Sequence, residues 1–147
     1  MRNYVIITDS MSDLPDDIAK KFETEVIPVE FLLDEKNYLN YSDNRELAPQ
    51  KFYQMMREGK SASTSQINIE RFLKVFEPIL KSGSDIIYIS FSSALSSTYN
   101  SAILAAKELQ NTYKDQKIFI VDSLSASMGE ALLVYYAALK KQDGFSI

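Results

Sequence analysis

The stretch Tyr4-Val5-Ile6-Ile7-Thr8-Asp9-Ser10 joins a short apolar run to a hydroxyl-rich string, and the chain repeats this arrangement twice. The strings Ser92-Ser93 and Asp122-Ser123 follow the apolar runs 86–89 and 118–121. Continuous apolar runs of this length are typical of strands buried on both faces of a parallel sheet. Because parallel strands end together at one edge, where ligands usually bind, we expect these three strings to lie side by side.

Segments with helical periodicity separate the strand-like runs, and this alternation predicts an α/β fold: a mostly parallel sheet with helices on both faces. The run 26–33 contains Pro28, which has no N–H to donate to a central ladder, so we expect that strand to lie at an edge or to bend. The polar stretch 34–50 is interpreted as a surface insertion or a hairpin. We expect strands over 4–8, 26–33, 85–90 and 117–122, and helices over 15–22, 47–57, 67–80, 97–113 and 126–141, with Pro78 kinking or ending its helix.

The composition excludes several function classes. The 147 residues carry 16 Lys+Arg against 20 Asp+Glu, a net charge of −4, which argues against nucleic acid or an anionic membrane as a partner. There is no cysteine and no histidine, so disulfides, cysteine nucleophiles and the usual general base are excluded. The longest apolar run, 131–139, is too short to cross a bilayer. We expect a single soluble, cytoplasmic domain over residues 1–147.

Glycine usage excludes two common nucleotide-binding loops. The chain has four glycines, and no two of them lie within ten residues of each other. A dinucleotide fingerprint or a P-loop needs clustered glycines so that backbone amides can approach the phosphates. There is also no Gly-x-Ser-x-Gly elbow, so no hydrolase nucleophile is indicated. We expect no cofactor.

The hydroxyl-rich strings have two interpretations each, a turn or helix cap and a ligand contact. The string Ser63-Thr64-Ser65-Gln66 precedes a predicted helix and has more donors than one cap needs, which favours an anion site. Residues 92–98 hold five hydroxyls in seven positions, and there we favour Ser93 as a ligand. For Ser10 the two interpretations are about equal, whereas for Ser125 and Ser127 a helix cap is favoured.

Taken together and in this order, the strings resemble those of the DegV family of bacterial lipid-binding proteins. The opening Thr8-Asp9-Ser10, the string 63–66, the segment 92–99 and the segment 122–129 match its four motifs. The chain departs from the pattern at Ala94 and Ser97, which replace glycines, and at 67–68, where Ile-Asn replaces Pro-Ser.

The resemblance implies a non-enzymatic protein that binds a long-chain fatty acid between two domains, of which this chain supplies the first. It implies that Thr64 and Ser93 hold the lipid carboxylate, with basic residues of the second domain, and that some members present it to a fatty acid kinase. The supporting residues are then Ser10, Ser65, Ser92, Ser125 and Ser127. A chain lacking its second domain is expected to self-associate through an exposed apolar surface.

Two alternatives from other classes remain open on sequence grounds. Asp9 at a strand end is a candidate Mg²⁺ ligand, which would make the chain a small α/β phosphotransferase, although one carboxylate is a weak metal site. The strings are also compatible with a structural or regulatory domain whose loops are capped and which has no ligand.

Overall fold

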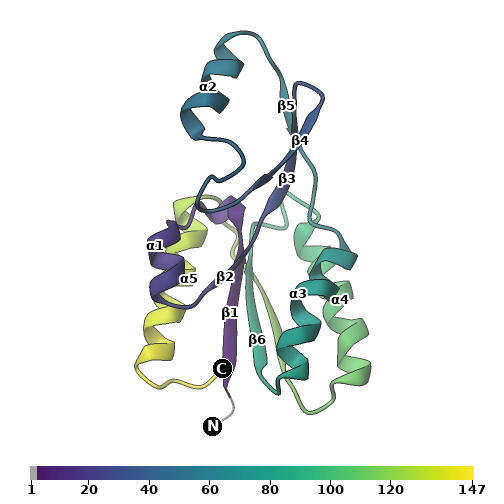
Figure 1. Ribbon diagram of the computed structural model, residues 1–147. Helices are drawn as coiled ribbons and strands as arrows, with labels where there is room; N and C mark the ends of the chain where they lie inside the picture. The colour runs from purple at the N-terminus through teal and green to yellow at the C-terminus, as the bar shows by residue number, and fades with distance from the viewer. Residues whose placement is uncertain (1–2) are drawn as a thin grey trace.

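The computed structural model describes residues 3–147 and contains two sheets (Figure 1). A four-stranded sheet has helices on both faces, and a three-stranded sheet carries one further helix. Along the chain the elements are β1 (Tyr4–Asp9), the 3-10 helix η1 (Ser10–Ser12), α1 (Asp16–Lys21), β2 (Glu25–Ile27), β3 (Val29–Leu33), β4 (Lys36–Asn40), α2 (Pro49–Arg57), β5 (Ala62–Thr64), α3 (Ile69–Lys81), β6 (Asp85–Ser90), α4 (Thr98–Thr112), β7 (Ile118–Asp122) and α5 (Met128–Gln142).

The four-stranded sheet is parallel throughout and has the order β2-β1-β6-β7. Helices α1 and α5 cover one face and α3 and α4 cover the other (Figure 1). Successive side chains of β1 serve the two faces in turn: Ile6 packs in the core beneath α1 and α5, and Ile7 packs in the core beneath α3 and α4. We call this sheet with its four helices the body. The predicted α/β class with a mostly parallel sheet is confirmed.

The second sheet comes from residues 29–64, which we call the arm (Figure 1). Strand β3 pairs antiparallel with β4 and with β5. The single strand expected over 26–33 is two strands: β2 lies at the edge of the parallel sheet, Pro28 interrupts the run, and β3 enters the other sheet. Proline leaves the ladder without a donor at this point, so the predicted bend is confirmed and becomes a change of sheet.

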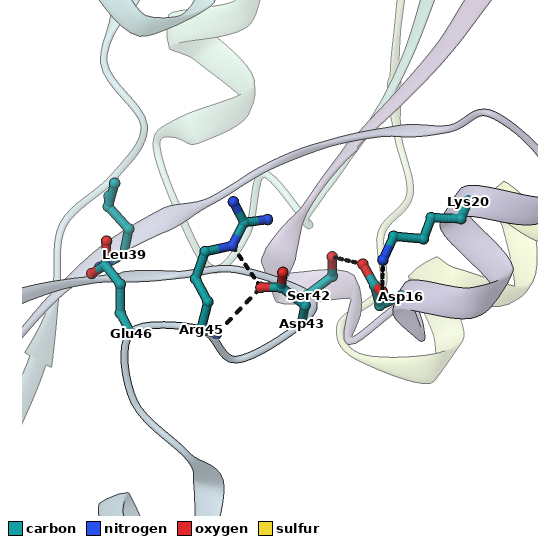
Figure 2. Close-up of polar contacts among 7 residues, drawn as sticks. All are labelled: Asp16, Lys20, Leu39, Ser42, Asp43, Arg45 and Glu46. Carbon is teal, nitrogen blue, oxygen red and sulfur yellow. Dashed lines mark hydrogen bonds and ion pairs between the residues drawn. The ribbon is translucent and has the colours of Figure 1, made fainter.

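Polar contacts at the base of the arm join it to the body (Figure 2). The Ser42 hydroxyl donates to Asp16 Oδ1 of α1 at 3.1 Å, and Asp16 also pairs with Lys20 one turn further along that helix at 2.6 Å. Within the same loop, Arg45 pairs with Asp43 at 2.8 Å. The Ser42–Asp16 contact is partly buried, whereas the Lys20 and Arg45 side chains are exposed. Solvent-exposed ion pairs contribute little stability, so the two ion pairs mainly orient the base of the arm.

The helix predicted over 67–80 is present with different bounds, Ile69–Lys81. Helix α3 begins at Ile69 and is capped by Asn68, whose side chain accepts the Arg71 N–H at 2.9 Å. The string 63–66 therefore does not cap it; Ser63 and Thr64 lie in β5. Pro78 does not end the helix, which continues to Lys81. Among the described residues, no helix combines the length and the apolar character needed to cross a membrane.

Candidate functional site

The C-terminal ends of β1, β6 and β7 meet at one edge of the parallel sheet. The pairing of these neighbouring strands is parallel, so the loops that follow Asp9, Ser90 and Asp122 emerge together. The arm projects from this same edge (Figure 1). The expectation that the three hydroxyl-rich strings lie along one edge is confirmed.

Hydrogen bonds connect these loops to one another. The Phe91 N–H donates to Asp9 Oδ2 at 3.1 Å, which joins the ends of β1 and β6. The Ser123 N–H donates to the Ser90 carbonyl at 3.1 Å, and the Ser92 N–H donates to the Ser125 carbonyl at 3.0 Å, which joins β6 to the loop after β7. The edge is therefore a cross-linked surface rather than three independent turns.

Ser93 lies exposed at this edge, and Asp122 fixes its position. The Ser93 N–H donates to Asp122 Oδ1 at 3.1 Å, and the same oxygen accepts the Leu124 N–H at 3.1 Å. Burial alone would raise the pKa of the Asp122 carboxyl, but hydrogen bonds from the Ser93 side chain and from these two N–H groups hold the pKa below its ordinary value. Asp122 is therefore ionised at neutral pH and holds the Ser93 loop against the end of β7.

Thr64 lies in the arm, at the end of β5, opposite Phe31 of β3. It is exposed and lines a cavity of about 460 Å³ with Phe31, Phe52 and other apolar side chains of the arm, and with Met11 and Asp13 of the body. Ser93 does not line this cavity.

The arm and the Ser93 loop approach each other three residues after Thr64. The buried Ile67 N–H donates to Thr98 Oγ1 at 3.2 Å, and Thr98 begins α4 directly after the Ser93 loop. The two predicted carboxylate ligands thus lie on different sheets whose connecting segments are hydrogen-bonded.

The predicted supporting serines have different environments. Ser10 is buried and its hydroxyl accepts the Val29 N–H at 3.0 Å, so it fixes the start of β3. Ser92 is buried in the Ser93 loop, where its hydroxyl accepts the Ala94 N–H at 3.3 Å. Ser65 is exposed, and its N–H donates to the Glu30 carbonyl at 3.0 Å.

Neither Ser125 nor Ser127 caps α5 through its side chain, contrary to the favoured prediction. Ser127 precedes the helix with a φ of 51°, and its hydroxyl donates to Asp13 Oδ2 at 2.6 Å instead. The Ser127 N–H donates to the Met11 carbonyl at 2.9 Å. Ser127 therefore connects the start of α5 to the turn after β1. Ser125 contributes its backbone carbonyl to Ser92, as described above.

Asp9 is buried and accepts three hydrogen bonds, which disfavours the Mg²⁺ alternative. Its Oδ2 accepts the Tyr88 hydroxyl at 2.6 Å and the Phe91 N–H at 3.1 Å, and its Oδ1 accepts the Met11 N–H at 3.1 Å. No oxygen faces an open position where a metal ion could bind, and residues 3–147 contain no cluster of three acidic side chains suited to a metal. Asp9 therefore has a structural role: its hydrogen bonds hold the end of β1 against β6 and the loop that follows β6.

Glu130 is a second buried carboxyl, and sequence reasoning missed it. It lies in the first turn of α5 with no exposed surface, and its Oε1 is 2.9 Å from Thr8 Oγ1. Thr8 Oγ1 also lies 3.0 Å from the Ile89 carbonyl, yet a hydroxyl has one proton to give. If Glu130 carries a proton, it donates to Thr8 and Thr8 donates to Ile89, so each of the two protons has an acceptor.

Electrostatics favour the same protonation state. Burial, together with the neighbouring carboxylates of Asp9 and Asp13, raises the pKa of Glu130 to about 9 against the opposing hydrogen bond from Thr8. The other oxygen, Oε2, has no hydrogen-bond partner among the described residues. A neutral acid leaves one buried carbonyl oxygen unpaired, which costs less than a buried, half-paired carboxylate.

Comparisons with known proteins agree with the motifs. The model of the family described as "uncharacterised protein, DegV family" matches residues 3–147. A DegV domain-containing protein of Clostridium perfringens is 46% identical over 147 residues, which is 100% of this chain and 50% of that protein. One from Caldanaerobacter subterraneus is 34% identical over 99% of this chain and 50% of that protein. The chain thus spans about half the length of the curated relatives it matches.

Solved structures match over the same extent. A DegV family protein of Thermus thermophilus, described as fatty acid binding, superposes with a TM-score of 0.86 and 31% identity over 100% of this chain and 50% of that one. A stearic acid-binding protein of Eubacterium ventriosum gives a TM-score of 0.88 and 26% identity over 98% of this chain and 49% of that one. With a family match across nearly its whole length, the chain belongs to the DegV family.

Proposed function

We propose that this chain binds a long-chain fatty acid and that the hydroxyls of Ser93 and Thr64 hold its carboxylate. The observation that carries the proposal is the exposed Ser93, fixed by Asp122 at an edge where three strand ends converge. Support comes from relatives that match this fold and are described as fatty-acid-binding proteins. Both side chains are exposed, in contrast to the buried and hydrogen-bonded Asp9, and the Ser93 hydroxyl can turn from Asp122 to a ligand, which favours binding over catalysis.

Physical chemistry assigns the head and the tail different tasks. Burying a tail of about 14 methylenes gains roughly 11 kcal/mol at about 0.8 kcal/mol each. Association takes back about 4 kcal/mol or more. Hydrogen bonds to a charged group add about 1.5–3 kcal/mol each. The tail therefore dominates affinity, and the hydroxyls determine where the carboxylate lies.

We further propose that the half of the relatives that these 147 residues do not match completes the apolar wall and supplies a cation for the head group. Losing half of the methylene contacts removes about 5–6 kcal/mol of gross transfer free energy, or about four decades of affinity. The 147 residues by themselves should then bind palmitate at micromolar or weaker concentrations. Nanomolar binding by this chain in isothermal titration would contradict the shared-site proposal.

A substitution series tests the head-group assignment. Thr64→Ala with Ser93→Ala should weaken binding by about a hundredfold or more, because two hydrogen bonds to a carboxylate are lost and each contributes about 1.5–3 kcal/mol. Ser97→Ala is the matched control, since Ser97 is an exposed serine of the same loop whose side chain does not cap α4. Equal dissociation constants for the double variant and the control would refute the assignment, and a lowered melting temperature would indicate a structural role instead.

The exposure of the head-group site also bears on a protein partner. A carboxylate held at the surface of the edge stays accessible, so we propose that the bound acid is presented to a fatty acid kinase in the cytoplasm. The test is phosphate transfer from ATP to palmitate by a bacterial fatty acid kinase catalytic subunit, with and without this chain. Transfer that does not depend on the chain would contradict a presenting role.

A further inference from the structure

Leu124 is the most exposed of the large apolar side chains in the described part of the protein, at 76%. It lies in the loop between β7 and α5 and has a φ of 50°, in the left-handed region that disfavours residues with a branched side chain. Glycine or asparagine would suit this backbone better, and a polar residue would suit this exposure better. The sequence therefore places a leucine where neither local conformation nor solvation favours one.

The loop hydrogen bonds place Leu124 beside the proposed carboxylate site. The backbone N–H groups of Leu124 and Ser93 both donate to Asp122 Oδ1, each at 3.1 Å, so one carboxylate oxygen holds the two residues side by side. A second exposed leucine, Leu95, is 65% exposed in the Ser93 loop, where its N–H donates to the Ser92 carbonyl at 3.0 Å. Two solvent-exposed leucines thus flank a hydroxyl that is itself exposed.

We propose that Leu124, together with Leu95, contacts the methylene groups next to the carboxylate of the bound acid. This inference rests on the proposed function and specifies which side chains contact the first part of the apolar tail, next to the carboxylate. A carboxylate at Ser93 brings its first methylenes within reach of these side chains, and their burial recovers the free energy that exposure costs the free protein. Locally unfavourable residues collect at ligand-binding positions for this reason.

A series of short acids tests the inference on the 147-residue chain itself. Acetate, butyrate, hexanoate and octanoate share one head group and differ only in the length of the tail. Differences among their affinities, measured by NMR titration of the backbone amides, therefore report contacts of the tail and not of the head group. In the unmodified chain the affinity should rise about two- to fourfold for each added methylene, the range from half to full burial. Leu124→Gly should flatten this dependence, so that the loss of affinity is largest for octanoate and smallest for acetate. Its melting temperature should stay the same or rise, because glycine relieves the left-handed backbone.

The controls separate failure of this inference from failure of the proposed function. Leu104→Ala removes a side chain that is 52% exposed on α4, away from the loop, and should keep the full chain-length dependence. Ser93→Ala should weaken all four acids by the same factor. A Leu124→Gly variant with the original chain-length dependence would overturn the inference and leave the head-group site intact.

Two other outcomes would also decide the question. If the acids bind but Ser93→Ala has no effect on any of them, the proposed head-group site fails and the inference fails with it. If Leu124→Gly instead abolishes concentration-dependent association of the chain and leaves the acid series unchanged, the leucine contacts a second copy and the inference is overturned.

Discussion

The body and the arm differ in how they are held together. In the body, the parallel sheet is covered on both faces and large side chains such as Phe72, Phe76 and Tyr88 are fully buried. In the arm, α2 has no buried residue and β5 is exposed along its whole length. The arm depends on one short sheet and on ring contacts such as Phe31 with Phe52, at 5.8 Å between centroids. Ser93 is therefore presented by the densely packed part of the molecule and Thr64 by the sparsely packed part.

Matched phenylalanine truncations should give the largest difference between the two regions. Phe76→Ala leaves a cavity in the body and should lower the free energy of unfolding by about 3–5 kcal/mol. Phe52→Ala affects a half-buried ring of the arm and should cost less than about 2 kcal/mol. Urea denaturation followed by circular dichroism measures both. Similar losses for the two variants would show that the arm is as integral to the core as the body.

The buried acid beneath the strand ends provides a pH-dependent test of the body. The pKa of Glu130 is raised from 4.5 to about 9, so the folded protein holds a proton that the unfolded chain releases. The contribution of Glu130 to the free energy of unfolding is fully present below pH 4.5 and is lost as the pH rises toward about 9. The groups facing Glu130 are Asp9, Asp13 and Tyr88.

Glu130→Gln replaces the acid with a neutral group of the same shape. The variant should match the unmodified chain near pH 5 and gain on it at higher pH, by at most about 1.4 kcal/mol per pH unit. Melting temperatures of both proteins at pH 5, 7 and 9 measure the difference. Melting curves that shift in parallel across this range would mean that Glu130 is already ionised in the folded protein.

An uncovered surface of the body should give the smallest effect. The two faces of the edge strand β7 differ in burial. On one face Ile118 and Ile120 pack against the core beneath α3 and α4. On the other face Phe119 and Val121 are 45% and 38% exposed. The chain should self-associate weakly through this face, because apolar surface beside an open strand edge favours contact between copies. Sedimentation velocity at increasing concentration, with Phe119→Lys as the disrupting variant, measures this. A monomer at all concentrations would contradict it.

The sequence predicted the body better than the arm, for a physical reason. Strands β1 and β6 are buried on both faces, so their apolar runs are continuous and their bounds are close to those expected. Strand β7 was expected to be buried in the same way, but at the sheet edge Phe119 and Val121 stay exposed, although its bounds are also close to those expected. Strand β5 consists of Ala62, Ser63 and Thr64, a sequence with no strand-like apolar pattern. It forms a strand because it pairs with the edge of β3, and the local sequence does not reveal that pairing.

The candidate site was predictable to a similar extent. The convergence of Ser10, Ser93 and Ser123 followed from the rule that parallel strands end at one edge. The neutral Glu130 was not predictable, because a glutamate in the first helical turn ordinarily faces solvent and stabilises the helix dipole. Its burial depends on the packing of α5 over Thr8, and only the fold brings these residues together.

We propose that the carboxylate of a bound fatty acid lies at the Ser93 edge. Octanoate labelled with ¹³C at the carboxyl carbon, titrated into the chain and observed by NMR, tests it directly. The labelled resonance should shift on binding to the unmodified chain, and the shift should be reduced or lost with Ser93→Ala while Ser97→Ala retains it. The same bound-state resonance in all three proteins would contradict the claim and place the head group elsewhere.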